Sequence, residues 1–437
     1  MSAVESVSPN PFGAYPESYY AASRNAAPDR PVLIGEERAD VTIIGGGYSG
    51  LSAGIALAEV GYKVALIESD RIGFGASGRN GGQIVNGLNA GLQAIEKRHG
   101  EDIAAFFGGL LQEGNRLIRE RVEKYNIACD LKDGNVFSAF TGKQMNELAE
   151  TEALWRKHGV RDLELLDREG IRAHVGTDSY VGGLIDHSGG HMHPLNLALG
   201  EAAALEELGG RVFEQSRVTS VDYSSARPVA KTKQGRIESD HMVICGNAYL
   251  DRTVPSLVPR ILPVSTQMMA TAPLSEDQAQ ALLPTDKCVE DCRYILDYFR
   301  LSADRRLLFG GGTVYGGHDV SDVIAKLRPN MLTLFPALKD VAIDYAWNGN
   351  FALSFTRIPQ MGRLAPHTYF AHGYSGHGVT GSHLFGKIVA DAINGDIARF
   401  DVFANLPWVP FPGGRTFGAT YSAIGSWYYG LRDRLGI

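Results

Sequence analysis

The sequence predicts an α/β (α+β) protein in which a discontinuous domain on a mainly parallel sheet is joined to a domain on an antiparallel sheet. Three observations support this fold class. A short apolar strand at residues 40–44 leads directly into a glycine-rich turn and a helix. Two later apolar segments, 242–248 and 369–371, also lead to glycine, and short alternating stretches between them are typical of antiparallel strands. With 437 residues, the chain can hold two or three domains.

The composition is that of a soluble globular protein. Hydrophobic residues make up 44% of the chain, and no uninterrupted apolar run approaches the ~18–20 residues of a membrane span. The net charge of −7 argues against nucleic acid as a partner, because phosphate contacts need basic surface. Residues 1–30 are polar and lack the apolar core of a secretory signal, so we expect a cytoplasmic protein.

The first glycine turn has the spacing of a Rossmann-like dinucleotide fingerprint. A strand at 40–44, the turn Gly45-Gly46-Gly47-Tyr48-Ser49-Gly50, a helix and a strand at 63–67 form a βαβ unit that ends on an acid. The glycines permit the tight turn, the approach of a pyrophosphate and close helix packing, while the acid can bind a ribose. The residues expected to contact the dinucleotide here are Gly45, Gly47, Tyr48, Ser49, Gly50, Glu68 and Ser69.

A second glycine cluster follows at residues 73–84. Its backbone N–H groups can hold a pyrophosphate and a ring, with two polar side chains as anchors. Glycine at this density is unusual in a loop that binds no ligand. The expected contacts are Gly75, Ala76, Ser77, Arg79, Asn80, Gly81, Gly82 and Gln83.

This second cluster resembles the flavin-contacting loop of the D-amino-acid-oxidase-like FAD oxidoreductases. The resemblance extends over nearly the whole chain and is carried by YYAASR at 19–24, FGASGRNGGQIVNG at 74–87 and GYSGHGVTGSHLFGKIVADAI at 373–393. Within the superfamily these segments are most similar to the γ-glutamylputrescine oxidase subfamily, which also takes in relatives assigned to other amines and cyclic imino acids. The resemblance implies an FAD-binding domain and the oxidation of a small amine.

The resemblance adds cofactor contacts far along the chain. It implies that Val218 meets adenine through its backbone and that the strand before Gly246 and Asn247 returns to the nucleotide. It also implies that the helix after residue 378 points its positive end at the flavin, which favours the negative charge of the reduced ring. The residues expected near the ring are Gly376, His377, Gly378, Val379 and Thr380.

The predicted domain boundaries follow from these contacts. We expect the FAD-binding domain to comprise residues 38–90, 180–250 and 355–400. The substrate domain should comprise 91–179, read as mostly helical, and 251–354, read as an antiparallel sheet. Residues 1–37 form an N-terminal extension. Residues 401–437 should pack on the body through an apolar stripe that includes Tyr421, Ile424, Tyr428, Leu431 and Leu435, with contact to a membrane surface as the alternative.

Aromatic residues near the domain joint are candidates for a substrate pocket. Their π faces can hold an alkylammonium group and help to remove its water. Tyr298 and Trp347 join His377 as candidate catalytic residues. The candidate substrate-binding residues are Tyr294, Tyr298, Arg300, Trp347 and Phe351, with Arg300 expected to pair with a distal carboxylate.

Several departures from the related oxidases shape the expected chemistry. Leu353 stands where sarcosine oxidases attach FAD to cysteine, and the loop around Gly78 lacks the attachment histidine of dimethylglycine-type enzymes, which together imply noncovalent FAD. The lysine that activates oxygen in sarcosine oxidase is missing, and Leu308 stands near its position, which leaves both oxidase and dehydrogenase activity open. In sarcosine-type oxidases an arginine and a lysine bind the carboxylate beside the amine. Residues 83–86 and Thr380 stand at these two positions here, so we expect an amine without an α-carboxylate.

The predicted function is therefore an FAD-dependent amine oxidoreductase that forms an imine, which hydrolyses to aldehyde and ammonia. Electrons pass to O₂, giving H₂O₂, or to another acceptor. A γ-glutamylputrescine-like substrate is favoured, and the alternatives are a cyclic or N-alkyl amino acid such as L-pipecolate, or a non-catalytic or tRNA-modifying flavoprotein. No metal is expected at the cluster Asp186, His187, His191 and His193, because C–N oxidation by flavin needs none. The oligomeric state stays open.

Overall fold

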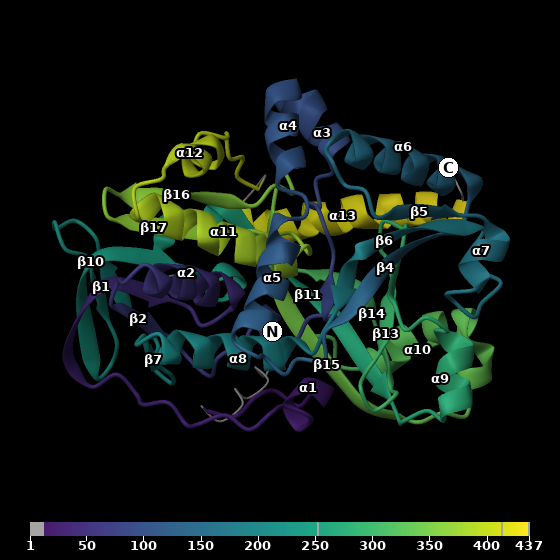
Figure 1. Cartoon of the computed structure of the whole chain (residues 1–437), viewed down its shortest axis with the longest axis horizontal. Helices are drawn as coiled ribbons and strands as arrows, with labels where there is room; N and C mark the ends of the chain where they lie inside the picture. Colours follow the sequence, from purple (N-terminus) through teal and green to yellow (C-terminus); the bar gives the residue numbers. More distant parts are fainter. Residues whose placement is uncertain (1–12, 251–252, 412–413, 436–437) are drawn as a thin grey trace, which may run out of the picture.

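The computed structural model describes residues 13–250, 253–411 and 414–435. The strands form two sheets that lie side by side, with helices packed over their outer faces (Figure 1). One sheet carries the predicted dinucleotide fingerprint, and the other carries most of the predicted pocket residues. A site between them can therefore take walls from both sheets.

The nucleotide sheet has a parallel centre. Strand β1 (Gly35–Ile44) lies between β2 (Val64–Ile67) and β10 (Gly235–Ile244), parallel to both. Beyond them lie β7 (Arg211–Phe213) on one side and β17 (Thr368–His372) and β16 (Gln360–Ala365) on the other, and the hairpin of β8 (Ser220–Asp222) and β9 (Val229–Lys231) extends β10. The carboxyl ends of the parallel strands meet at one edge, where ligands bind in such sheets.

Three helices cover one face of the nucleotide sheet. Helix α2 (Tyr48–Glu59) packs between α8 (Pro194–Glu207) and α11 (Gly378–Ile393), as seen in Figure 1. The approach is close because glycines stand at the contacts: a Cβ on Gly50 would lie 2.0 Å from the Gly45 carbonyl oxygen, and one on Gly386 would lie 2.5 Å from the Ser49 carbonyl oxygen. Larger residues at these positions would push the helix away from the strand and from its neighbour.

A buried ion network ties these helices to α5 (Glu113–Lys124). Glu201 on α8 lies 3.3 Å from the Arg121 guanidinium and 3.1 Å from Nε2 of His383 on α11. Burial opposes ionisation of Glu201, but His383 and Arg121 lower its pKa, so the carboxylate keeps its charge. The network aligns three helices whose ends reach the dinucleotide turn.

The second sheet is mixed and larger than predicted. Its order is β15 (Ile343–Ser354), β11 (Ile261–Thr271), β14 (Leu307–Tyr315), β13 (Tyr298–Leu301), β12 (Cys288–Asp291), β4 (Lys132–Ala139), β6 (Gly182–His191) and β3 (Gln83–Ile84), with β5 (Leu163–Leu166) paired to β6. The prediction that 91–179 is mostly helical misses β4 and β5. Tertiary pairing with β6 and β12 decides the conformation of β4. Strands β6 and β3, from segments that the sequence analysis assigned to the FAD-binding domain, pair in this second sheet.

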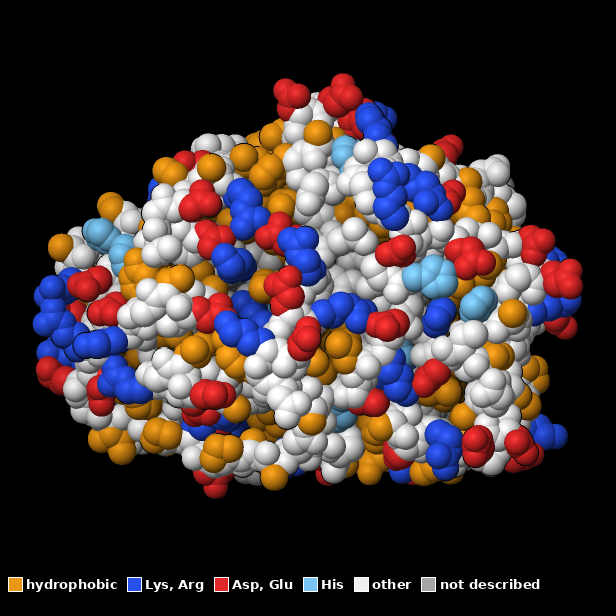
Figure 2. All heavy atoms as spheres, in the orientation of Figure 1, with side chains coloured by type: hydrophobic (Ala, Val, Ile, Leu, Met, Phe, Trp, Pro, Cys, Tyr) orange, Lys and Arg blue, Asp and Glu red, His pale blue; other side chains and the backbone are white. Residues whose placement is uncertain are grey.

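Other helices surround the second sheet and the edge between the sheets. They are α1 (Tyr19–Ala22), α3 (Leu92–His99), α4 (Glu101–Gly109), α6 (Gly142–Lys157), α7 (Arg168–Arg172), α9 (Glu276–Leu282), α10 (Val323–Leu334) and α13 (Gly414–Leu435). Helix α12 (Ala398–Ala404) packs instead on α11 and on β16 of the nucleotide sheet. Tyr19 and Tyr20 of α1 are buried, so this helix anchors the N-terminal extension to the core, while residues 24–29 are exposed. On the face in Figure 2, acidic and basic side chains are interspersed rather than gathered by sign.

The C-terminal helix α13 packs in the opposite sense to the prediction. Gly418 and Ser426 are buried against the body, while Tyr421, Ile424 and Tyr428 of the predicted stripe are each more than half exposed. The side chain of Leu435 lies outside the described residues. No helix among the described residues is long and apolar enough to cross a membrane.

Candidate active site

Two cavities meet at the carboxyl edge of the nucleotide sheet. We call the first, of about 360 Å³, the nucleotide cavity; it runs from Glu68 and Val218 to the glycine turn. The second, of about 580 Å³, is the central cavity, and it lies between the two sheets. Both have sizes typical of ligand sites. The two share lining residues, namely Gly47, Ala76, Ser77, Cys245 and Asn247, and so adjoin one another.

The nucleotide cavity has the features that a dinucleotide needs. Gly47 caps the N-terminus of α2, where unsatisfied N–H groups favour phosphate. The Tyr48 N–H donates to Oγ of Ser77 at 3.0 Å, which brings the two glycine clusters together. The Glu68 carboxylate accepts from the N–H groups of Gly46 at 2.6 Å and Asp70 at 3.0 Å. Burial raises the pKa of Glu68, and these bonds oppose that shift.

The structure brings together nearly all the predicted cofactor residues. Each of them lines one of the two cavities except Gly50 and Gly82. Gly50 supports helix packing instead. Gly82 has φ +77°, and a Cβ there would lie 2.3 Å from the Met192 carbonyl oxygen and 2.5 Å from Nη2 of Arg300. Sequence reasoning missed Tyr249 and Cys245 in these walls, since neither belongs to a glycine motif.

The central cavity is partly aromatic, as predicted. Tyr294, Tyr298 and Phe351 line it. The Tyr298 ring lies so close to Gly81 and Gly310 that a Cβ on either would come within 2.6 Å of it. Burial raises the pKa of Tyr298 to about 12, so its phenol is neutral at ordinary pH. It therefore offers an aromatic face and a hydroxyl beside the second glycine cluster.

Arg300 and Trp347 do not line the central cavity, which corrects two predicted substrate residues. Arg300 is 2% exposed, and its guanidinium donates to the Gly81 carbonyl at 2.7 Å and to the Tyr20 hydroxyl at 3.1 Å. Trp347 is 3% exposed and donates from Nε1 to the Arg79 carbonyl at 3.0 Å. The glycine cluster folds back over this part of the second sheet, so both side chains support the loop instead of facing a substrate.

Charged residues that the sequence analysis did not single out line the central cavity. Glu290 on β12 is 9% exposed, and burial followed by the charge of Asp291 raises its pKa to about 8. Arg293 also lines the cavity, but Asp291 and Asp297 pair with it. Arg357 has no acidic partner among the described residues. Two consecutive acids at the end of the short strand β12, Glu290 and Asp291, were the one local signal in the sequence of charge at this cavity.

His377 lies at the start of α11 and lines the central cavity together with Gly378, Val379 and Thr380. Burial lowers the pKa of His377 to about 4, so its imidazole is neutral at pH 7. Its Nδ1 has no hydrogen-bond partner among the described residues. Thr380 donates from Oγ1 to the Val85 carbonyl at 2.7 Å, which fixes the positive end of α11 against the loop after the second glycine cluster.

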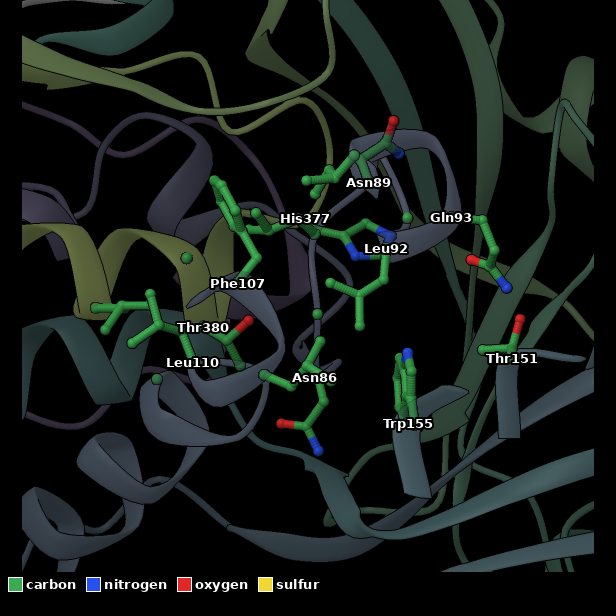
Figure 3. Close-up of a pocket in the computed structure, with 18 of the residues that line it drawn as sticks. Asn86, Asn89, Leu92, Gln93, Phe107, Leu110, Thr151, Trp155, His377 and Thr380 are labelled. Atoms are coloured by element: carbon green, nitrogen blue, oxygen red, sulfur yellow. The ribbon is translucent and has the colours of Figure 1, made fainter. Parts of the chain in front are cut away.

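A third cavity of about 220 Å³, which we call the apolar cavity, lies next to the central cavity. Figure 3 shows Leu92, Phe107, Leu110 and Trp155 around it, with His377 projecting between Asn89 and Leu92. Asn89, His377 and Thr380 line both cavities. The sequence analysis made no prediction of this space, because its walls come from several helices that the sequence alone does not place.

The histidine-rich segment 186–193 is dispersed in the structure. Asp186 accepts from Asn86 at 2.6 Å, the exposed His187 pairs with Glu164, and His193 caps α8. Within the described ranges, no three metal-ligating side chains gather into a group that could hold an ion.

The whole arrangement matches a known family of flavoproteins. The family model described as FAD dependent oxidoreductase (DAO) matches residues 40–392, which include both glycine clusters and the start of α11. The chain belongs to this DAO family. These residues fit FAD, since two adjoining cavities extend from Glu68, the acid expected to bind the ribose, to the positive end of α11.

Other DAO proteins are similar over most of their length. The chain is 49% identical over 96% of its length to γ-glutamylputrescine oxidoreductase of Escherichia coli, 99% of which is covered. It is 42% identical over 95% of its length to the probable oxidoreductase OrdL of Haemophilus influenzae, 97% of which is covered. The structure of glycine oxidase from Geobacillus kaustophilus superposes with a TM-score of 0.71 at 22% identity, covering 85% of this chain and all of that one. This DAO protein is therefore an FAD-dependent oxidoreductase that acts on amines.

Replacing Glu68 by Ala should weaken FAD binding. Loss of the hydrogen bonds to the ribose should cost about 1–3 kcal/mol, which raises the FAD dissociation constant roughly 5- to 150-fold. Flavin fluorescence titration of the apoprotein measures the constant, and Glu123→Ala, at an exposed acid on α5, is the matched control. An unchanged constant would remove Glu68 from the site.

Replacing Arg300 by Lys should lower FAD retention and thermal stability together. A lysine keeps the charge but cannot donate to Gly81 and Tyr20 in the fixed geometry of a guanidinium. Cofactor content after gel filtration and the melting temperature measure the effect, with Arg116→Lys at an exposed position as control. A variant with normal FAD content and stability, but a raised KM only for carboxylate-bearing substrates, would restore Arg300 as a substrate residue.

Proposed function

We propose that this enzyme oxidises the primary amino group of a γ-glutamylputrescine-like amine in the cytoplasm, with noncovalent FAD. The observation that carries the proposal is the cavity-facing carboxyl group of Glu290. It is buried, lines the central cavity and has no ion-pair partner among the described residues. A buried acid without a partner favours a ligand that brings a positive charge. An alkylammonium group is such a ligand.

Arg357 is the candidate partner for the distal carboxylate of the substrate. It replaces Arg300 in that role, because it lines the central cavity and has no acidic partner among the described residues. Near the start of α11 the lining residues are Gln83, Val85 and Thr380, none of them cationic. A carboxylate on the reacting carbon would therefore be buried there with no cationic side chain among these residues to pair with it. The charge pattern suits an amine whose carboxylate lies far from the reacting end.

The side chains of the cavity can perform the steps that precede oxidation. Once Glu290 has released its own proton to solvent, its carboxylate accepts the proton of the ammonium group, which leaves the neutral amine that oxidation requires. Tyr298 and Phe351 hold the alkyl chain and exclude water from it. FAD, when bound, supplies the hydride acceptor, and the positive end of α11 favours the negative charge that then develops. The imine product hydrolyses to an aldehyde and ammonia.

Noncovalent attachment of FAD is supported by the residues of the central cavity. Leu353 lines it and offers no nucleophile. Cys245 also lines it, but burial raises the pKa of its thiol to about 12, so the reactive thiolate is scarce at pH 7. We propose dioxygen as the electron acceptor and H₂O₂ as its product.

Anaerobic titration with γ-glutamylputrescine, putrescine, sarcosine and L-pipecolate tests the substrate. We expect the flavin absorbance to bleach fastest with γ-glutamylputrescine, because its two charged ends match Glu290 and Arg357. Arg357→Met should weaken binding of γ-glutamylputrescine but leave putrescine unaffected, since putrescine has no carboxylate. Rapid bleaching by sarcosine or L-pipecolate, with none by either putrescine compound, would overturn the proposal.

Replacing Glu290 by Gln should change the pH dependence of flavin reduction. In the wild type, Glu290 is protonated below about pH 8 and the free amine is cationic, so binding of the amine releases one proton. The rate constant of flavin reduction at limiting substrate therefore rises up to about pH 8. In the variant the proton must leave to solvent, and the rise should move toward the pKa of the amine itself, about 10 as in lysine. Stopped-flow reduction at limiting substrate measures this shift. A rise that stays near pH 8 in Glu290→Gln would show that another group titrates.

A further inference from the structure

The apolar cavity has walls that suit a small uncharged molecule. Among the described residues, no acid, lysine or arginine lines it, and His377 is neutral at pH 7. Three polar side chains at its edge are engaged elsewhere: Asn86 donates to Asp186, Thr151 to Glu147 and Thr380 to Val85. Asn89 and Gln93 are the other uncharged polar side chains of its lining. The apolar side chains that surround the space are Leu88, Leu92, Ile95, Phe107, Leu110, Leu111, Phe137, Leu148, Trp155, Leu184, Leu384, Phe385 and Phe403.

The size of the cavity narrows the class of occupant. Dry apolar cavities of about 150 Å³ bind benzene or xenon, and this one measures about 220 Å³. A charged amine would lose hydration here without gaining an ion pair, because no acid lines the cavity. The cavity is therefore unsuited to the substrate and suited to a gas or a small ring.

The position of the cavity connects it to the cofactor. Asn89, His377 and Thr380 line it on one side and the central cavity on the other, so one layer of side chains separates the two spaces. Figure 3 shows the His377 ring projecting among the cavity residues. His377 therefore stands between the two spaces; its ring bonds to the Gly87 backbone, and its Nδ1 makes no hydrogen bond to the described residues.

We propose that the apolar cavity holds dioxygen and delivers it past His377 to the reduced cofactor. Dioxygen takes two electrons and one proton from the reduced flavin and a second proton from solvent, which leaves H₂O₂ and oxidised FAD. The proposal deepens the acceptor half of the proposed function and is independent of the identity of the amine. Dioxygen is apolar, so these walls concentrate it near the flavin while the polar substrate keeps to the central cavity.

Filling the cavity tests the proposal. Leu148→Phe and Leu111→Phe each add a ring to the wall, and Leu163→Phe makes the same change at an equally buried leucine outside it. Crystals of the holoenzyme under xenon should hold xenon in the cavity of the wild type and the control, and lose it in both filled variants. Enzyme reduced with dithionite under argon, so that no amine is needed, is then mixed with dissolved oxygen in a stopped-flow instrument. We expect the rate constant of reoxidation to decrease several-fold in the filled variants and to stay at the wild-type value in Leu163→Phe.

Four results would overturn the proposal. Xenon could bind only elsewhere, or filling could leave reoxidation by oxygen unchanged. Wild-type enzyme that dioxygen does not reoxidise would remove the gas from the mechanism. Filled variants that react normally with oxygen but slowly with a soluble quinone would identify a ring-shaped acceptor as the occupant. Because dithionite replaces the amine, each of these outcomes is distinct from failure of the substrate assignment.

Discussion

A buried guanidinium joins three parts of the chain that are distant in sequence. Arg300 extends from β13 of the second sheet to the carbonyl of Gly81 in the second glycine cluster and to the hydroxyl of Tyr20 in α1. A buried arginine is stable only while such acceptors surround it. The loop that lines the flavin end of the site is consequently held by the substrate domain, and the two domains cannot move apart without exposing this charge. The cofactor site is a property of both sheets.

Local motifs made part of this site predictable from sequence. The strand, glycine turn and Glu68 lie within one βαβ unit, and the glycines there are required by contacts a few residues away, such as that between Gly50 and Gly45. The start of α11 is equally local, because a helix N-terminus carries its partial charge whatever surrounds it. For these residues the chemistry can be argued from spacing alone.

Other features of the site depend on which distant parts of the chain pack together. Arg300 and Trp347 belong to strands that the second glycine cluster covers, and this cluster lies more than 200 residues earlier in the chain. Strand β4 gained its conformation from pairing with β6 and β12. Glu290 became a candidate for substrate binding only when its neighbours showed that no cation pairs with it. Pattern and propensity carry no information on contacts of this kind.

The order of strands in the nucleotide sheet also affects when the chain can capture FAD during its synthesis. Gly35 at the start of β1 pairs with Gly235, and β10 in turn pairs with β17 near residue 370. Such distant parallel pairings form slowly, since most of the chain must be present before the sheet can close. Thr380, which lines the central cavity, emerges from the ribosome later still. Capture of FAD is thus a late event that completes folding, and it cannot guide the first half of the chain as it is made.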